Sequence, residues 1–295
     1  MKPGGRGERG RLFIVGTPIG HLGDFSFRGL EVLRGAAVVA AEDTRRTRRL
    51  LMHYEVSRDV ASLHAHSRPE AIERLLDTAE AGEDVAYVTD AGTPAISDPG
   101  AALAARAHER GIPVVAVPGA SAVVAALAAS GLPGDRFVFA GFPPRKGTAR
   151  AALLARLAAE PWTSVWYEAP TRTAALLDDL AGVCGPERPA AVARELTKLH
   201  EEVRRGTVGA LAQYYREHPA RGEVTIVLGG APPSSPPGGA GGASAAAAAM
   251  PDRETARALI VALRASGSAP GTIAKELARR LGISRRDAYR LLTTE

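Results

Sequence analysis

Short β-rich runs alternate with helical patterns along most of this chain, and that alternation restricts the fold more than any other feature. Apolar runs occupy 12–15, 37–41, 60–64, 84–89 and 113–117, and helical spacing follows them at 26–34, 44–53, 69–81, 100–110 and 120–130. Apolar strands joined by helices are typical of a mostly parallel sheet covered on both faces. This part therefore predicts an α/β domain.

A second cycle of the same kind begins near Phe137. The runs FVFAGF, SVWYEA, PAAVARE and VTIVLGG are separated by helical patterns at 148–159, through Asp179 and around 209–215. The turn-rich segment SGLPGD at 130–135 is the natural boundary. We therefore expect two α/β domains, 12–133 and 134–230, after a basic N-terminal tail at 1–11.

A tether and a helical tail follow. Residues 231–249 contain only Ala, Pro, Ser and Gly, which predicts a flexible linker at 231–250. Within 251–295, Thr272 and Ser284 stand at predicted helix starts, an arrangement that resembles a helix-turn-helix. Its second helix carries Arg285, Arg286 and Arg290, which suit RNA phosphates. A small bundle that contacts protein is the alternative.

Charge and composition narrow the setting. The net charge is +5, and the positive excess lies at the two ends of the chain, which suits an anionic partner. No apolar run reaches the length of a membrane span or of a signal-peptide core. A single cysteine, Cys184, allows neither an internal disulfide nor a thiolate metal cage. We expect a cytoplasmic protein with no metal and no membrane association.

Three loops directly after predicted strands are candidates for chemistry. They are GTPIGHLGD (16–24), DAGTPAISDPG (90–100) and VPGASA (117–122). Open α/β sheets bind ligands at the carboxyl ends of their strands, and long rigid loops there are usually functional. The glycine spacing fits neither a dinucleotide fingerprint nor a Walker sequence. Each loop taken alone could be ordinary turn chemistry.

Taken together with AAEDTRRTRRLL, FAGFPPRK, YEAPTR and ARELTKLHEEVRRG, these loops resemble the tetrapyrrole (corrin/porphyrin) methylase superfamily. Within it they are most similar to the bacterial ribosomal small-subunit RNA cytidine 2′-O-ribose methyltransferases. The resemblance runs from Leu12 to about Gly230, and EDTRRT and ARELTK are its most specific parts. His21, Ser67 and Thr171 depart from the usual Asn, Asn and His.

The resemblance implies an S-adenosylmethionine-dependent enzyme that methylates 16S ribosomal RNA or the small ribosomal subunit and forms a homodimer. The methyl donor would lie in a cleft between the two domains. Carried over residue by residue, the donor would meet Pro18, Asp90, Ala91, Gly92, Ile96, Ser97, Ser121, Ala122, Tyr167, Glu168 and Thr225. Gly, Pro and Ala loops without a Walker lysine suit such a donor.

Transfer to a ribose hydroxyl requires alignment and the loss of one proton. The candidate catalytic groups are Glu42, Asp43, Glu195 and Lys198, which follow predicted strands, although each could instead belong to an ion-pair network. His64 and His66 are better read as surface residues. The RNA would pass the basic side chains of Arg45, Arg46, Arg48, Arg49, Arg145 and Lys146.

Two other functions compete with this one. A tetrapyrrole-precursor methylase would share the donor site but has no use for ELTK or a basic tail. A non-catalytic nucleic-acid-binding regulator would explain the tail and leave the long loop at 90–100 without a role.

Overall fold

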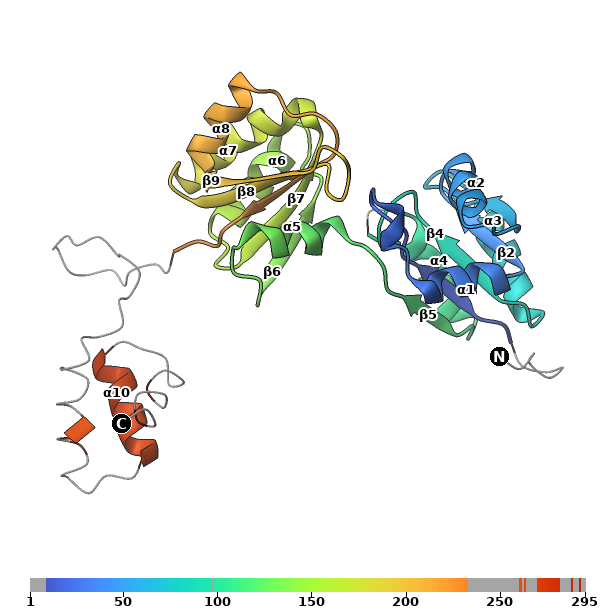
Figure 1. Cartoon of the computed structure of the whole chain (residues 1–295), viewed down its shortest axis with the longest axis horizontal. Helices are drawn as coiled ribbons and strands as arrows, with labels where there is room; N and C mark the ends of the chain where they lie inside the picture. Colours follow the sequence, from blue (N-terminus) through green and yellow to red (C-terminus); the bar gives the residue numbers. More distant parts are fainter. Residues whose placement is uncertain are drawn as a thin grey trace. The chain divides into compact units, whose positions relative to one another are not determined.

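The computed structural model describes residues 9–96, 98–232, 260–261, 263, 270–281, 288 and 292. The chain divides into two compact units, Met1–Ser234 and Ser235–Glu295. The first unit contains two five-stranded sheets with their helices (Figure 1). No helix in the described part of the chain is long and apolar enough to cross a membrane.

The first sheet is entirely parallel, as its apolar runs predict, and its strand order is β3-β2-β4-β1-β5. The strands are β1 (Leu12–Val15), β2 (Val38–Ala41), β3 (Asp59–Ser62), β4 (Val85–Val88) and β5 (Val114–Val117). The helices that cover this sheet are α1 (Phe27–Gly35), α2 (Thr44–His53), α3 (Pro69–Glu80) and α4 (Gly100–Glu109), and a short 3-10 helix, η1 (Leu22–Asp24), precedes α1. We call this sheet and its four α-helices the first lobe.

Both faces of the first sheet are buried, because alternate residues of each strand point to opposite sides. Phe13 and Val15 pack with Leu33 of α1 and Leu51 of α2 in one cluster. A second cluster contains Leu12 and Tyr87 together with residues of α3 and α4. The predicted two-sided α/β layer is confirmed here.

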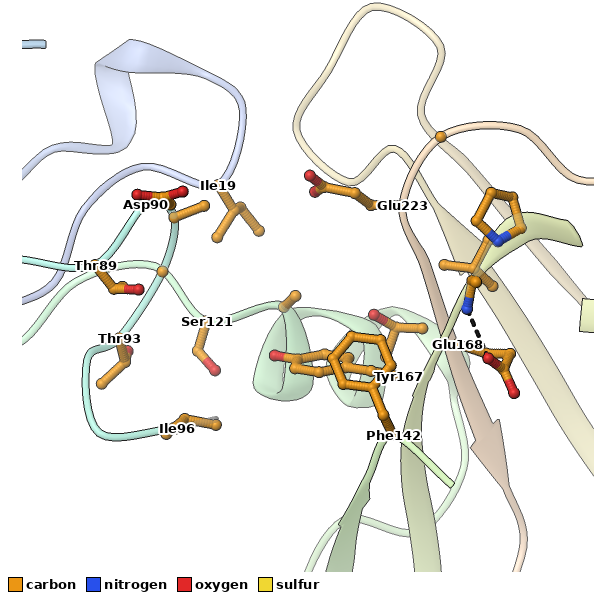
Figure 2. Close-up of a pocket in the computed structure, with 18 of the residues that line it drawn as sticks. Ile19, Thr89, Asp90, Thr93, Ile96, Ser121, Phe142, Tyr167, Glu168 and Glu223 are labelled. Atoms are coloured by element: carbon orange, nitrogen blue, oxygen red, sulfur yellow. Dashed lines mark hydrogen bonds between the residues drawn. The ribbon is translucent and has the colours of Figure 1, made fainter. Parts of the chain in front are cut away.

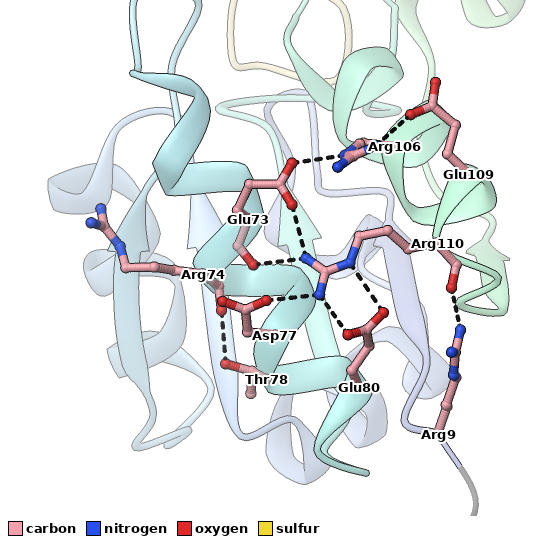
Figure 3. A network of polar contacts seen from close by, with 9 residues as sticks. All are labelled: Arg9, Glu73, Arg74, Asp77, Thr78, Glu80, Arg106, Glu109 and Arg110. Carbon is pink, nitrogen blue, oxygen red and sulfur yellow. Dashed lines mark hydrogen bonds and ion pairs between the residues drawn. The ribbon is translucent and has the colours of Figure 1, made fainter.

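Arg110, the residue that follows α4, joins that helix to α3 (Figure 3). Its guanidinium contacts Glu73 at 2.9 Å, Asp77 at 2.7 Å and Glu80 at 2.6 Å. Arg106 of α4 adds a contact with Glu73 at 2.7 Å. These acids lie on one side of α3, so the two helices are held together by charge at their outer edge as well as by apolar packing.

The second sheet is mixed and has the order β6-β7-β10-β8-β9. Only β6 and β7 pair in parallel among these described strands; the other three pairings are antiparallel. The strands are β6 (Phe137–Gly141), β7 (Thr163–Glu168), β8 (Pro189–Arg194), β9 (Glu202–Thr207) and β10 (Val224–Leu228). The helices are α6 (Thr148–Ala158), α7 (Thr173–Cys184) and α8 (Val208–Glu217), with a short 3-10 helix, η2 (Pro170–Arg172), before α7. Strand β9 is not among the strands predicted from the sequence.

Helix α5 (Ala122–Ser130) packs against the second sheet. Val123, Ala126 and Leu127 lie in one buried cluster with residues of β7, β8 and β10, and α6, α7 and α8 cover the opposite face. We call this sheet with α5 to α8 the second lobe. The packing favours a boundary before α5, at residues 118–121, over the predicted boundary at 130–135.

The link between the lobes is therefore short. Residues 118–121 connect the end of β5 to the start of α5 (Figure 1). Gly119 in this link lies against the end of β1: a Cβ atom on Gly119 would come within 2.8 Å of the backbone of Gly16. The link is thus closely packed at the point where the chain leaves the first sheet.

In the second unit, the structure describes α10 (Pro270–Leu281) and a few single positions. Ile273, Ala274 and Leu277 of α10 form a buried cluster with Ile260 and Ala288. The three arginines assigned to RNA in this tail, Arg285, Arg286 and Arg290, lie outside the described residues.

Candidate functional site

A cavity of about 390 Å³ opens where loops of the first lobe face the end of the second sheet (Figure 2). We call it the main cavity. Ile19 lies after β1, Asp90 and Gly92 after β4, and Ser121 at the start of α5. The second-lobe wall comes from the ends of β6 and β7 and from the start of β10. Its lining is Ile19, Arg46, Thr89, Asp90, Ala91, Gly92, Thr93, Ile96, Ser121, Ala122, Phe142, Tyr167, Glu168, Ala169, Pro170, Gly222, Glu223, Val224 and Thr225.

Gly92 is fixed by its pairing with Thr17. The Thr17 amide donates to the Gly92 carbonyl at 2.9 Å and the Gly92 amide donates back at 3.2 Å. Gly92 has a φ of +86°, which side chains rarely adopt, and an added Cβ would lie 3.3 Å from Cγ2 of Ile19. The loop after β4 is therefore held against the loop after β1, and the glycine is required by the backbone conformation.

Asp98 anchors the far end of the same loop. Its Oδ1 accepts hydrogen bonds from the amides of Ala95 (3.0 Å) and Gly100 (2.7 Å) and from the hydroxyl of Tyr87 (3.1 Å). Tyr87 is fully buried, and burial and the nearby carboxylates raise the pKa of its hydroxyl. Asp98 is not among the residues predicted for the site, although an Asp followed by Pro-Gly at a helix start is a recognisable signal for such an anchor.

Asp90 links the loop after β4 to helix α2. One carboxylate oxygen accepts a hydrogen bond from the Asp43 amide at 2.9 Å, and the other lies 3.7 Å from the guanidinium of Arg46. Asp43 itself is the N-cap of α2 and accepts from the Arg45 amide at 2.8 Å. These contacts hold the Asp90 carboxylate in the first-lobe wall of the cavity, beside the guanidinium of Arg46.

Aromatic rings form the opposite wall (Figure 2). Tyr167 packs edge-on against Phe139 at 4.9 Å and contacts Phe142 at 5.3 Å. Burial raises the pKa of the Tyr167 hydroxyl, and a hydrogen bond with the backbone of Val123 in α5 opposes that rise. Glu168 is 2% exposed and holds the turn that follows β7, because it accepts from the Ala169 amide at 2.7 Å and pairs with Arg172.

A second hollow of about 430 Å³ adjoins the main cavity. The two share Ile19, Arg46, Thr89, Asp90, Ala91 and Glu223. We call the second one the basic hollow, because Arg46 and Arg49 of α2, His53 at its end and Lys198 also line it. Pro18, predicted as a donor contact, lies on this hollow and is absent from the described lining of the main cavity.

Lys198 reaches the basic hollow from a strained turn after β8. Its ammonium lies 2.9 Å from Glu195 and 3.2 Å from Glu223. Glu195 and Thr197 have φ values of 51° and 65°, which are uncommon for residues other than glycine. The two carboxylates raise the pKa of Lys198 against the effect of burial, and Lys198 and the Glu223 amide lower the pKa of Glu195.

The four candidate bases thus occupy different environments. Lys198 stays protonated at neutral pH and cannot accept a proton, which argues against its predicted role as a base. Hydrogen bonds from Arg45 lower the pKa of Asp43, as ion pairing does for Glu195, so both are weak bases. Burial and the charges of Asp90 and Asp98 raise the pKa of Glu42, which lies next to Asp43 but lines neither hollow.

The structure brings most of the predicted donor contacts together. Those on the main cavity are Asp90, Ala91, Gly92, Ile96, Ser121, Ala122, Tyr167, Glu168 and Thr225, and Ser97 lies outside the described residues. Thr89, Thr93, Phe142 and Glu223 also line it without having been predicted. In the described part of the chain, no group of three or more His, Cys, Asp or Glu side chains could hold a metal ion.

The remaining predicted residues are spread over the surface. Arg45, Arg145 and Lys146 are exposed and line none of the hollows described here. Arg48 lines a separate shallow hollow on the other side of α2. The three residues that differ from the usual family pattern have ordinary local roles. His21 caps η1 through Nδ1, Ser67 accepts a hydrogen bond from the His64 amide at 2.9 Å, and Thr171 is exposed in η2.

Solved structures share this fold at low identity. A cobalt precorrin-4 methyltransferase matches with a TM-score of 0.56 and 22% identity over 74% of this chain and 94% of that one. A uroporphyrin-III C-methyl transferase from Thermus thermophilus, complexed with S-adenyl homocysteine, matches with a TM-score of 0.54 and 20% identity over 75% and 97%. A diphthine synthase matches with a TM-score of 0.56 and 19% identity over 74% and 89%. These matches establish the fold alone, because one fold hosts several activities.

Sequence comparisons are more specific. The family profile described as Tetrapyrrole (Corrin/Porphyrin) Methylases matches residues 11–212. Proteins named ribosomal RNA small subunit methyltransferase I are similar to most of the chain. The one from Synechocystis sp. is 42% identical over 96% of this chain and 97% of its own length, and the one from Xylella fastidiosa is 49% identical over 75% and 82%. The chain therefore belongs to the tetrapyrrole methylase family and, within it, to the ribosomal RNA small subunit methyltransferase I family.

Proposed function

We propose that this protein transfers a methyl group from S-adenosylmethionine to the ribose 2′-oxygen of a cytidine in 16S ribosomal RNA. The observation that carries the proposal is the pairing of two hollows: a largely apolar cavity with carboxylates and hydroxyls on its walls, joined to a basic one. The family membership supports it, because the relatives are named as ribosomal RNA small subunit methyltransferases.

The main cavity suits a sulfonium donor. Such a donor supplies a methyl group on a positively charged sulfur, next to an adenine ring and an amino-acid head. The cavity offers an aromatic wall at Phe142 and Tyr167 for a flat ring and the carboxylates of Asp90 and Glu223 for positive charge. Arg46 is its one cationic side chain among the described lining residues, so the cavity lacks the cradle that a polyphosphate needs.

The predicted donor contacts keep that role in the proposal. Gly92 and Ala91 would present backbone groups, since their loop is pinned by the pairing of Thr17 with Gly92. Ser121 would offer its hydroxyl, which makes no side-chain hydrogen bond to the start of α5. Thr225 contributes a hydroxyl from β10, and Ile96 an apolar wall.

Alignment supplies most of the rate in this scheme. Aligned reactants contribute about 7–11 kcal/mol, whereas a general base adds about 10²- to 10⁴-fold. We propose Glu42 as the residue that favours loss of the hydroxyl proton, because it is the one carboxylate of the three candidates whose pKa is raised, and Lys198 is held protonated by its ion pairs. Glu42→Gln should lower kcat well beyond any effect on donor affinity, and Asp43→Asn is the matched comparison for a carboxylate that caps a helix.

Recognition of the RNA involves the basic side chains outside the cavity. We propose that Arg45, Arg145 and Lys146 contact phosphates away from the target nucleotide, because all three are exposed and none lines the main cavity. The basic tail after residue 250 adds to this attraction. We further propose a homodimer that acts in the cytoplasm on 16S ribosomal RNA or the small ribosomal subunit.

The test is a transfer assay with labelled donor and small ribosomal subunits. The proposal predicts label in one nucleotide of 16S RNA and a gain of alkali resistance at that linkage, because a 2′-O-methyl group blocks the attack of the hydroxyl on its own phosphate. Label on a base, which leaves the linkage alkali-sensitive, would contradict the ribose assignment. Transfer of label to a porphyrin precursor, with no label gained by the RNA, would favour a tetrapyrrole methylase.

A further inference from the structure

We propose that the basic hollow binds the phosphate on the 3′ side of the target nucleotide, and that Arg49 is the side chain that meets it. The inference rests on the proposed function and adds the position of the substrate within the site. It divides the arginines of α2 into two groups, one that holds the target nucleotide and one that faces elsewhere.

The division follows from the helix. Arg46 and Arg49 are three residues apart, so they lie on one face of α2, and both line the basic hollow. Arg48 lies on another face and lines the separate shallow hollow with Met52 and Arg58. Arg48 and Arg49 are both exposed and adjacent in sequence, so they form a matched pair that differs in which hollow each one reaches.

Charge pairing within the basic hollow leaves Arg49 available. The two carboxylates that line the basic hollow already have cationic partners, since Asp90 lies 3.7 Å from Arg46 and Glu223 lies 3.2 Å from Lys198. No ion pair involves Arg49 among the residues that the structure describes. Lys198 also contacts Glu195, so among the described residues Arg49 is the arginine or lysine of the hollow that has no carboxylate partner. An anion entering the hollow would contact Arg49 without displacing an existing pair.

The chemistry of ribose explains why that anion should be the 3′-phosphate. The 2′-hydroxyl and the 3′-phosphate are attached to neighbouring carbons of one sugar, so they occupy adjoining sites. The main cavity and the basic hollow likewise adjoin, and they share Asp90 and Glu223. A hydroxyl placed at this shared wall would face the donor on one side and direct its phosphate into the basic hollow.

The experiment compares Arg49→Ala with Arg48→Ala in the full-length protein. For Arg49→Ala we expect KM for small subunits to rise about tenfold or more, the donor Kd to stay within about twofold of wild type, and the salt slope of RNA binding to fall by about one. Arg48→Ala should change KM by less than about threefold. Arg49→Lys should recover part of the loss, because it restores the charge without the planar fork.

Several results would overturn the inference. Equal losses in Arg48→Ala and Arg49→Ala would show a general electrostatic attraction with no dedicated phosphate site. A matching loss of donor affinity or of thermal stability in Arg49→Ala would show a structural role. A short RNA with an uncharged methylphosphonate 3′ to its cytidine should bind wild type and Arg49→Ala equally; a persisting difference would place another group against Arg49.

The same experiment separates this inference from the proposed function. If wild type transfers no methyl group to small subunits, the proposed function fails. Binding of the phosphate-bearing and methylphosphonate RNAs would still decide whether Arg49 meets a phosphate. If transfer occurs and Arg49→Ala matches Arg48→Ala, the function stands and the assignment of the basic hollow is wrong.

Discussion

Replacing Gly92 by alanine tests whether the loop after β4 must keep its present conformation. The residue has a φ of +86°, and a left-handed conformation costs an alanine about 1–2 kcal/mol. The new Cβ would also lie 3.3 Å from Cγ2 of Ile19, which is 8% exposed and packed into the cluster beneath α5. Both the backbone conformation and the contact with Ile19 therefore disfavour a side chain at this position.

That cost should be measurable either as weaker donor binding or as a smaller free energy of unfolding. If the loop leaves its pairing with Thr17 and returns only on binding, the donor Kd rises by about 5- to 30-fold. If the loop stays, the free energy of unfolding falls by the same 1–2 kcal/mol, which lowers Tm by about 2–8 °C for a unit of this size. We expect most of the cost in affinity, because the loop lines a cavity and has room to move toward it.

The assay is titration calorimetry with S-adenosylmethionine together with thermal unfolding. Gly182→Ala is the matched control: it lies inside α7, and an added Cβ meets nothing within 4 Å. That variant should gain about 0.5–1 kcal/mol of stability and bind the donor as wild type does. A Gly92→Ala protein with unchanged donor affinity and unchanged Tm would refute the reasoning.

Three further predictions concern other parts of the chain. Arg106 and Arg110 lower the pKa of Glu73, and Arg110 lowers that of Glu80, so the contribution of these carboxylates to stability is complete above the unfolded-state pKa and is lost as pH falls through the folded-state values. Arg110→Ala should therefore lose less Tm than wild type between neutral pH and roughly pH 3, and an equal loss would contradict the prediction. Deleting 250–295 should leave donor affinity unchanged and reduce both RNA affinity and its salt slope, as measured by filter binding at several salt concentrations. Cys184→Ser should keep its transfer activity, because burial raises the pKa of this thiol and the residue is absent from the described lining of both hollows. Loss of activity in a folded variant would contradict this prediction and point to a covalent role for the thiol.

The first sheet could be predicted almost completely, because a parallel strand buried on both faces leaves a continuous apolar run. Strand β9 could not be predicted in this way. It is an edge strand in which Glu202 and Arg204 form ion pairs and Arg205 is exposed, so it has no apolar run. Its pairing with β8 is decided by the turn at 195–201, which local sequence patterns do not describe.

The sheet against which helix α5 packs could not be predicted from the sequence either, for a different reason. Its sequence is apolar on nearly every side, so periodicity shows that it is buried and does not show against which sheet. The loops of the site could be found because they follow strands. The role of Asp43 could have been recognised, since an Asp directly before a helix is a common N-cap. Glu223 gave no signal, because it precedes a strand and acts through contacts with Glu195 and Lys198.

The short link at residues 118–121 affects how this enzyme could be recombined with its relatives. Because α5 packs on the second sheet, an exchange of whole lobes must cut the chain within these four residues. Ser121 there lines the main cavity, and Gly119 lies against the first sheet. A hybrid joined at this link has a donor pocket with one wall from each of the two proteins. A hybrid joined at 130–135 separates α5 from the second sheet, on which it packs. Exchange of whole lobes therefore always alters the donor pocket. A new substrate specificity is reached more easily by small changes in the loops that line the site.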